Sequence, residues 1–194
     1  MSKILALETS CEQASIALLI DGALQHATLT GHANHSEHLL PSIRRLCAEA
    51  GVSLRALDAV AFGAGPGAFT GVRLACGVAQ GIALGADLGV VPVGSLAALA
   101  MQAVAEGGEG HVCAITDARM GEVYAAAFRV TAAGVEELAP PCCAAPAELD
   151  FTARLQTQDW HWCGSALGVY GDVLEECVRA ADLRCASWQP GLVP

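Results

Sequence analysis

A glycine-rich loop that leads into a helix is the first feature of the sequence able to bind a charged ligand. The loop GPGAFTG runs from Gly65 to Gly71, and Arg73 follows it in the predicted helix. Backbone N–H groups at the start of a helix attract anions, so the loop could hold a phosphate. No lysine follows the glycines as it does in a Walker sequence, which argues against nucleotide hydrolysis at this loop.

Two carboxylates near the first predicted loop extend this candidate site. Glu8 and Glu12 stand four residues apart, and carboxylate oxygens can position a metal-bound nucleotide. The loop between them has no further glycine or lysine to hold phosphate, so we expect no ATP hydrolysis and no cofactor. The residues that would contact a nucleotide are Glu8, Thr9, Ser10, Gly65 and Gly67.

Three histidines raise the question of a metal site. His32, His35 and His38 are spaced three apart, and two histidines three or four apart on a helix can ligate one metal ion. His32 precedes the predicted helix, no Asp or Cys stands nearby, and Glu37 points to another face. The pattern therefore favours a polar helix end, and we expect no metal.

A charged segment in the second half of the chain, DARMGE, lies between two predicted strands. Asp117, Arg119 and Glu122 favour a hairpin turn with surface charge. Their charge density beside Tyr124 also suits a contact with another protein.

The helix predicted from Thr70, its expected cap, to Gly85 has two sides without large side chains. Gly77, Gly81 and Gly85 form one row with a four-residue step, and the second row is Gly71, Ala75, Ala79 and Ala83. Residues four apart share a helix face. Each glycine inside a helix costs about 1 kcal/mol relative to alanine, so a compensating close approach is required. The partner in that approach is the chain's own sheet, another chain, or one for each row.

A second amphipathic helix is predicted over His35–Ala50, with Gly51 ending it. Asn34 or Ser36 caps its start, and Pro41 fits near its beginning. Core packing accounts for part of its apolar stripe, and we expect the rest to meet a partner. The stripe consists of Leu39, Leu40, Ile43, Leu46, Cys47 and Ala50.

The order of elements predicts an α/β chain with two lobes, residues 1–105 and residues 106–194. The polar segment EGGEG, Glu106–Gly110, marks the boundary, and we expect the smaller second lobe to be truncated at its C-terminus. The first lobe opens with an antiparallel meander whose hairpin signal is Asp21-Gly22. Predicted strands of the first lobe are Lys3–Thr9, Ser15–Ile20, Leu24–Thr30, Ala59–Phe62 and Val90–Val93, before a helix at Leu96–Ala105.

The second lobe is predicted to begin with strands and to end with helices. Pro140, Pro141 and Pro146 interrupt the strand pattern. The predicted strands are Val112–Thr116, Val123–Val130, Val135–Leu138 and Trp160–Cys163, and the predicted helices are Ala147–Leu155 and Gly171–Ala181.

Composition restricts the partners of the chain. The net charge of −10 makes direct, strong binding to nucleic acid unlikely through the overall field. Hydrophobic residues make up 54% of the chain and charged residues 15%, which suggests extra surface buried against a partner. The nine cysteines are scattered and form no C-x-x-C pair, so we expect reduced core residues of a cytoplasmic protein. Leu88–Ala105 lacks charge, but Pro92 and Gly94 divide it into a strand and a helix.

Four segments in order resemble one family. They are ETSCEQAS from Glu8, HSEHLLPSI from His35, GPGAFTGVR from Gly65 and DARMGEVY from Asp117. Together they resemble the TsaB (YeaZ) family of the actin-like ATPase and sugar kinase superfamily (ASKHA, RNase H-like). The resemblance runs from Lys3 to about Val130, and more weakly to Gly171.

The resemblance implies an α/β, actin-like fold of two lobes with mixed sheets flanked by helices. It also implies a non-catalytic scaffold that dimerises with the catalytic paralogue TsaD and works with a small ATPase, TsaE. The pair supports threonylcarbamoyl transfer to adenosine 37 of ANN-decoding tRNAs, with tRNA reached only through the complex. The chain alone would form a homodimer. The implied interface is His35, Leu39, Leu40, Ile43, Leu46, Cys47, Phe69, Thr70, Arg73, Gly77 and Gly81.

The sequence departs from the family pattern at two positions. Ala68 stands where the family usually has Ser, and Glu8 where it often has Asp. Neither change supplies the His-x-x-x-His pair with which the paralogue holds a metal. The alternative function is an actin-like ATP-dependent enzyme or a metallopeptidase.

Overall fold

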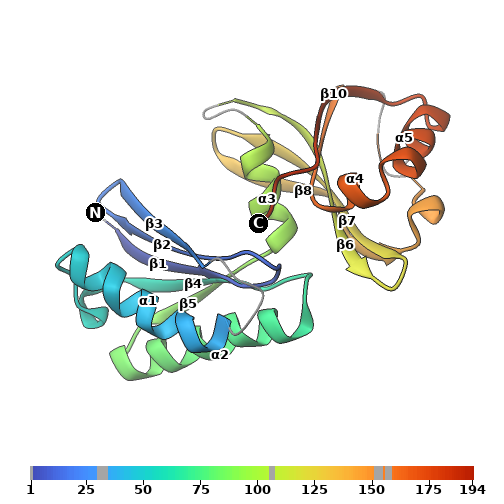
Figure 1. The fold of residues 1–194 in the computed structure, drawn as a ribbon. Coiled ribbons are helices and arrows are strands. Elements are labelled where there is room, and N and C mark those ends of the chain that lie inside the picture. The colour runs from blue at the N-terminus through green and yellow to red at the C-terminus, as the bar shows by residue number, and fades with distance from the viewer. Residues whose placement is uncertain (1, 30–34, 105–107, 151–154, 156–158) are drawn as a thin grey trace. The chain divides into compact units, whose positions relative to one another are not determined.

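The computed structural model describes residues 2–29, 35–104, 108–150, 155 and 159–194. The chain divides into two compact units, Met1–Ser95 and Leu96–Pro194, each built on its own five-stranded mixed sheet (Figure 1). The sequence analysis divides the lobes at EGGEG, ten residues later. The difference arises because α3 (Ser95–Ala103) packs its apolar side chains with the strands of the second unit.

The sheet of the first unit has the strand order β3-β2-β1-β4-β5. The first three strands are antiparallel, and β4 and β5 run parallel to β1. The predicted meander and its Asp21-Gly22 turn are confirmed, with φ of 51° and 90° at the two turn residues. The strands are β1 (Lys3–Glu8), β2 (Ala14–Ile20), β3 (Ala23–Leu29), β4 (Ala59–Gly63) and β5 (Gly89–Val93).

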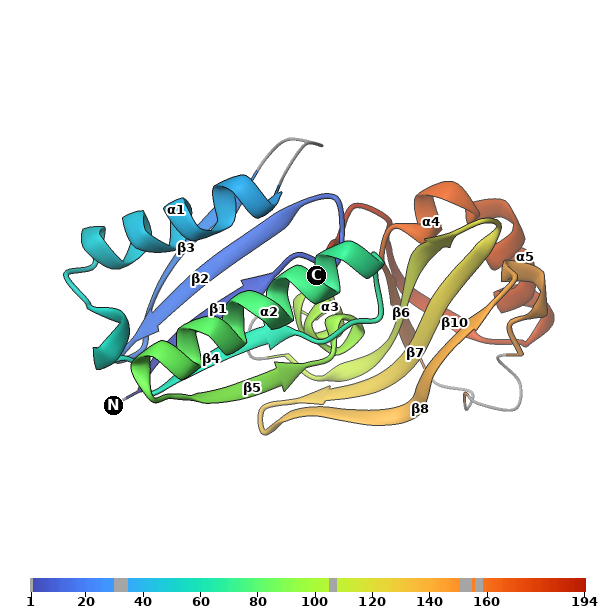
Figure 2. The same ribbon diagram turned by 90° about the horizontal axis from the view of Figure 1, so that it is seen from below.

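Two helices, α1 (His35–Glu49) and α2 (Phe69–Ala86), cover one face of this sheet (Figure 2). A 3-10 turn at Leu54–Ala56 (η1) precedes β4. Alternate strand residues enter the core between sheet and helices, as the period of a half-buried strand requires. That core contains Leu5, Leu7, Ile16, Leu18, Leu39, Ile43, Leu46, Cys47, Leu57, Val60, Ala79 and Ile82.

The predicted starts of both helices need correction. Thr70 does not cap α2: it lies inside the helix, whose N-cap is Ala68 with no side-chain cap hydrogen bond. Ser36 likewise lies inside α1, and the other predicted cap, Asn34, is outside the described residues. Pro41 lies inside α1 rather than near its beginning.

The second unit repeats the strand arrangement of the first. Its order, read as β8-β7-β6-β9-β10, matches β3-β2-β1-β4-β5, with three antiparallel strands followed by two parallel ones. The two halves thus share one topology although the sequence shows no repeat. The strands are β6 (Gly110–Arg119), β7 (Glu122–Thr131), β8 (Gly134–Ala144), β9 (Asp159–Cys163) and β10 (Arg184–Gln189).

Both faces of the second sheet carry apolar side chains. Neighbouring strand residues alternate between a cluster with α3 and a cluster with α4 (Ala166–Val169) and α5 (Gly171–Ala180). Val112 and Ala114 join the first cluster, and Cys113 and Ile115 the second. The predicted strand at Trp160 and helix at Gly171 are confirmed, whereas α4 and the length of β10 were not predicted.

The segment around the three prolines differs from the prediction. β8 continues past Leu138 through Pro140 and Pro141 to Ala144. It is an edge strand, and its register against β7 shifts beside the prolines, which is where a sheet tolerates residues without an N–H donor. The helix predicted at Ala147–Leu155 is a 3-10 turn at Pro146–Glu148 (η2), and most of the remainder is outside the described residues.

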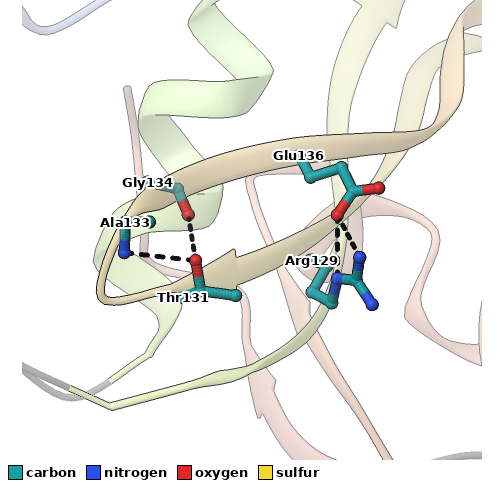
Figure 3. Close-up of polar contacts among 5 residues, drawn as sticks. All are labelled: Arg129, Thr131, Ala133, Gly134 and Glu136. Carbon is teal, nitrogen blue, oxygen red and sulfur yellow. Dashed lines mark hydrogen bonds and ion pairs between the residues drawn. The ribbon is translucent and has the colours of Figure 1, made fainter.

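Local polar contacts close the β7–β8 hairpin (Figure 3). The Thr131 hydroxyl accepts the Ala133 N–H at 3.2 Å and donates to the Gly134 carbonyl at 3.3 Å. Two strand positions further from the turn, Arg129 Nε donates to Glu136 Oε2 at 2.9 Å. These groups are exposed or half-buried, so they define the turn and add little to stability.

The cysteines are less uniformly buried than the sequence analysis expects. Cys47, Cys113 and Cys163 are buried, whereas Cys143 and Cys185 are exposed, and all nine are free thiols. Burial raises the pKa of Cys163 to about 12 and that of Cys113 well above its usual value. The two buried thiols of the second unit are therefore protonated at neutral pH.

We predict that iodoacetamide at pH 8 modifies Cys143 and Cys185 in the folded chain but leaves Cys113 and Cys163 unmodified. A pKa of about 12 leaves Cys163 with about 1,000-fold less thiolate than a thiol at its ordinary value, and burial blocks the reagent as well. Peptide mass spectrometry before and after urea unfolding measures this difference. Equal modification of all four cysteines in the folded chain would contradict the assigned core.

Candidate protein-interaction surface

The inner row of small residues on α2 packs on the unit's own sheet. Gly71, Ala75, Ala79 and Ala83 are buried. A Cβ atom at Gly71 would overlap the backbone carbonyl oxygen of Thr9. The small residues of this row therefore allow close contact inside the first unit, as expected if one row packs on the chain's own sheet.

The outer row faces away from the sheet. A Cβ atom built at Gly77, Gly81 or Gly85 would have no atom of the described residues within 4 Å, apart from its own helix backbone and immediate neighbours. Nothing in the described chain thus compensates the roughly 3 kcal/mol that three helical glycines cost. The outer row leaves the α2 backbone accessible along about two turns.

Three large side chains, two of them stacked on each other, border the outer row. At the start of α2, Phe69 is 66% exposed, and the Arg73 guanidinium lies 3.7 Å from the centre of its ring. Near the end, Leu84 is 88% exposed. Leu84 follows Gly77 by seven residues and Gly81 by three, so all three share one helix face. We call Phe69, Arg73, Gly77, Gly81 and Leu84 the outer face of α2.

The apolar stripe of α1 is mostly unavailable to a partner. Leu39, Ile43, Leu46 and Cys47, all predicted at the interface, lie in the core of the first unit with at most 5% of their surface exposed. Leu40 is 44% exposed and, with half-buried His35, remains on the side away from the core. The stripe is thus chiefly the core-facing side of an amphipathic helix.

Thr70 is exposed on the first turn of α2, next to the outer face. Since α1 and α2 cover the same face of the sheet and contact each other, their outward sides form one candidate surface. The predicted residues that lie there are His35, Leu40, Phe69, Thr70, Arg73, Gly77 and Gly81. Leu84 was missed, although its seven-residue spacing from Gly77 was a readable signal.

The outer face also explains why α2 resembles a membrane span. Its 18 residues have a mean hydropathy of 1.3, and among the described helices it alone is long and apolar enough to cross a membrane. Length and composition are weak evidence, because a helix with small apolar residues on two sides passes the same test. The charged Arg73 and the buried inner row favour a surface that meets protein.

The residues proposed for nucleotide contact come together, but they bond to one another. Glu8 lies at the carboxyl end of β1, where open α/β sheets commonly bind ligands. Its carboxylate accepts the Ser10 N–H at 2.7 Å and the Ser95 hydroxyl at 2.9 Å. Ser10 in turn accepts the Ala68 N–H through its carbonyl at 2.7 Å. One backbone donor at the start of α2, the Ala68 N–H, is thereby used within the chain.

Gly65 and Gly67 belong to the same closed arrangement. The Gly65 carbonyl accepts the Ser95 N–H at 2.8 Å, and a Cβ atom at Gly67 would lie 2.5 Å from the Ser10 carbonyl oxygen. The Ser10 hydroxyl is buried and has no hydrogen-bond partner among the described residues. The loop therefore offers a single hydroxyl beside an occupied carboxylate, which is a poor phosphate site.

The remaining chemical candidates form no centre in the described part of the chain. Within it, no group of three or more His, Cys, Asp or Glu is arranged to hold a metal ion. His35 and His38 lie on α1, while His32 is outside the described residues. DARMGE forms the β6–β7 turn as predicted, with Asp117 accepting the Arg119 N–H at 2.9 Å.

Comparison with known sequences places these features in a family context. A family model described as TsaD, tRNA N6-adenosine threonylcarbamoyltransferase, matches residues 25–189. Two curated relatives are named tRNA threonylcarbamoyladenosine biosynthesis protein TsaB. The relative from Haemophilus influenzae is 46% identical over 121 residues, 62% of this chain and 51% of the relative. The relative from Escherichia coli is 41% identical over 127 residues, 66% of this chain and 55% of the relative.

The chain thus spans about half the length of these curated relatives. Two solved structures from Pseudomonas aeruginosa align with all of this chain, and the aligned region is 86% of each of their chains. One, described as an uncharacterized protein with similarity to peptidase YEAZ, has a TM-score of 0.88 at 37% identity. The other, YeaZ, has a TM-score of 0.86 at 36% identity. The likeness confirms the predicted fold class of two mixed sheets flanked by helices.

The two rows of α2 predict opposite effects of the same substitution on the isolated chain. Gly81→Ala should raise the free energy of unfolding by about 0.5–1 kcal/mol, because alanine favours the helix and the added methyl meets no atom. Gly71→Ala should lower it by about 1–3 kcal/mol, because the methyl collides with the Thr9 backbone. Urea unfolding of both variants measures the difference. A loss of stability in Gly81→Ala would show that the outer row packs inside the chain.

Proposed function

The chain belongs to the TsaB (YeaZ) family, and we propose that it acts as a non-catalytic subunit in the threonylcarbamoylation of tRNA adenosine. In this proposal it binds a TsaD-like paralogue, which holds the metal and transfers the threonylcarbamoyl group to adenosine 37 of ANN-decoding tRNAs. A TsaE-like ATPase works with the pair. The names of the TsaB relatives support the pathway, and the match to the TsaD family model supports descent from a shared ancestor of the two subunits.

The single observation that carries the scaffold role is the open outer row of α2. Three glycines there destabilise a helix and contact nothing in the chain. A second helix can approach such a row more closely than it can approach ordinary side chains, because no Cβ atoms separate the two backbones. The dispersion energy of that close contact offsets the helix cost in the complex.

The surroundings of the glycines suit a protein partner. Phe69 and Leu84 supply apolar area at the two ends of the outer face, and aromatic residues such as Phe are enriched at protein interfaces. Arg73 stacks on Phe69, which holds its guanidinium ready for a carboxylate of the partner. The side chains of α1 that remain exposed, Leu40 among them, extend the same surface.

The charge of the chain is consistent with an indirect role toward tRNA. A protein with 20 acidic and 10 basic residues repels a polyanion, so tRNA is bound through the paralogue in this proposal. In the absence of the paralogue the same outer face can pair with a second copy of itself. A homodimer of this kind competes with the hetero-complex, because both use α2.

The alternative, an ATP-dependent enzyme or metallopeptidase, receives less support from the loop that would serve it. The Glu8 carboxylate already accepts two hydrogen bonds, and the start of α2 is bonded to Ser10. Steady turnover of ATP or of a peptide by the purified chain alone would favour this alternative over the scaffold.

We predict that Gly81→Leu weakens binding to the TsaD-like paralogue by at least about tenfold, a change of roughly 1.4 kcal/mol. The leucine side chain enters open space in the isolated chain, so folding is retained while the close approach of a partner helix is blocked. Isothermal titration calorimetry measures the dissociation constant. Gly171→Leu is the matched control. Gly171 is the first residue of α5 in the second unit, and a Cβ atom added there also has no atom of the described residues within 4 Å.

The cellular form of this prediction concerns the modified nucleoside. Cells that depend on this chain should lose threonylcarbamoyladenosine when they carry Gly81→Leu and retain it with Gly171→Leu, as measured by mass spectrometry of digested tRNA. A folded Gly81→Leu chain that binds the paralogue and supports modification at the wild-type level would overturn the proposed scaffold role.

A further inference from the structure

The buried polar side chains gather at one place, behind the start of α2. Among the described residues, those classed as both polar and buried are Thr9, Ser10 and Ser95, each at most 4% exposed. Thr9 and Ser10 follow β1, and Ser95 begins α3. Buried polar groups that are hydrogen-bonded specify a particular arrangement, since loss of a partner leaves an uncompensated group.

The hydrogen bonds of this cluster tie the starts of two helices, α2 and α3, to the end of β1. The Thr9 hydroxyl donates to the Gly71 carbonyl on α2 at 2.6 Å. The Ser10 carbonyl accepts the N–H of Ala68, the N-cap of α2, and Glu8 accepts the Ser95 hydroxyl. We call residues Glu8–Ser10 the β1 anchor.

The β1 anchor takes the place of an ordinary helix cap. No side chain caps α2, and Thr70, the residue of capping type nearby, lies inside the helix. Helix starts need partners for their free N–H groups, and here the Ser10 backbone supplies one. Glycine at position 71 is required for the approach, since any larger residue would collide with the Thr9 carbonyl.

The anchored position lies directly behind the exposed pair. Residues two apart in a helix differ by about 200° around its axis, so Phe69 and Arg73 project on the side opposite Gly71. Whatever fixes Gly71 against β1 therefore fixes the place of the Phe69–Arg73 pair on the outer face.

We propose that Thr9 is a positioning residue for partner binding: its hydroxyl holds the first turn of α2 against β1 and so presents Phe69 and Arg73 to the partner. This inference rests on the proposed function for its consequence in binding, but not for the anchoring itself. In this proposal the β1 anchor contributes to binding of the protein partner, whereas the sequence suggested contacts with a nucleotide.

The experiment compares Thr9→Val, which removes only the hydroxyl, with Thr9→Ser, which keeps it. In the free chain, hydrogen exchange of the Val72, Arg73, Leu74 and Ala75 amides should be about fivefold faster in Thr9→Val, as expected for one lost hydrogen bond. Exchange in β2 and in the last turns of α2 should be unchanged. Thr9→Ser should match the wild type, and so should Thr28→Val, an isosteric change at an exposed threonine of β3.

Binding is then measured with the same variants and the purified TsaD-like paralogue. The dissociation constant should rise about fivefold for Thr9→Val and return to the wild-type value for Thr9→Ser. If Thr9→Val does not fold, Thr9→Ala, which also removes the hydroxyl donated to Gly71, takes its place in both measurements.

The outcomes separate this inference from the proposed function. Faster exchange at the start of α2 with unchanged binding would overturn the positioning role and leave the scaffold function intact. The anchoring would be overturned if exchange in Thr9→Val were faster by the same factor across the whole first unit, or if it did not differ from the wild type anywhere. A wild-type chain that fails to bind the paralogue would overturn the proposed function, while the exchange data alone would still decide whether Thr9 anchors α2.

Discussion

The lack of side-chain bulk along two sides of α2 is the constraint on which the rest of the structure depends. On its inner side, missing bulk lets the helix backbone contact the end of β1, where the Thr9 carbonyl approaches Gly71. On its outer side, Gly77 and Gly81 have no side chains and face open space. One helix thus meets its own sheet at backbone distance and keeps a second backbone surface available.

The contacts at the start of α2 also involve the carboxyl end of β1. In the first unit, the carboxyl ends of parallel strands meet at Glu8, which is the usual ligand position of an open α/β sheet. Here the Glu8 carboxylate accepts hydrogen bonds from Ser10 and Ser95, so its two oxygens take part in internal anchoring. The duplicated strand order of the two units preserves the architecture. In the proposed complex, the catalytic groups belong to the paralogue and this chain contributes a shaped surface.

Sequence reasoning succeeded where a residue type permits few conformations. The Asp21-Gly22 turn, the antiparallel meander of the first three strands and the amphipathic period of α1 follow from local chemistry, and the structure confirms them. It failed where distant contacts decide the outcome. Thr70 is of a residue type that commonly caps helices. In the structure, however, the Ser10 carbonyl accepts the N–H of Ala68, which is the N-cap, so α2 begins earlier than predicted. Pro140 and Pro141 read as a break, yet an edge strand accommodates them, and no local pattern reveals which strand is at the edge.

The candidate surface shows the same division. The four-residue step of the glycines predicted two small-residue faces, but only coordinates distinguish the inner row from the outer one. A structure of the chain bound to the TsaD-like paralogue is the most direct measurement of the central claim. We expect a partner helix whose axis crosses α2 at Gly77 and Gly81 at a distance of about 8 Å, the short end of helix packing distances. A complex in which the partner sits elsewhere and these glycines still face solvent would contradict it.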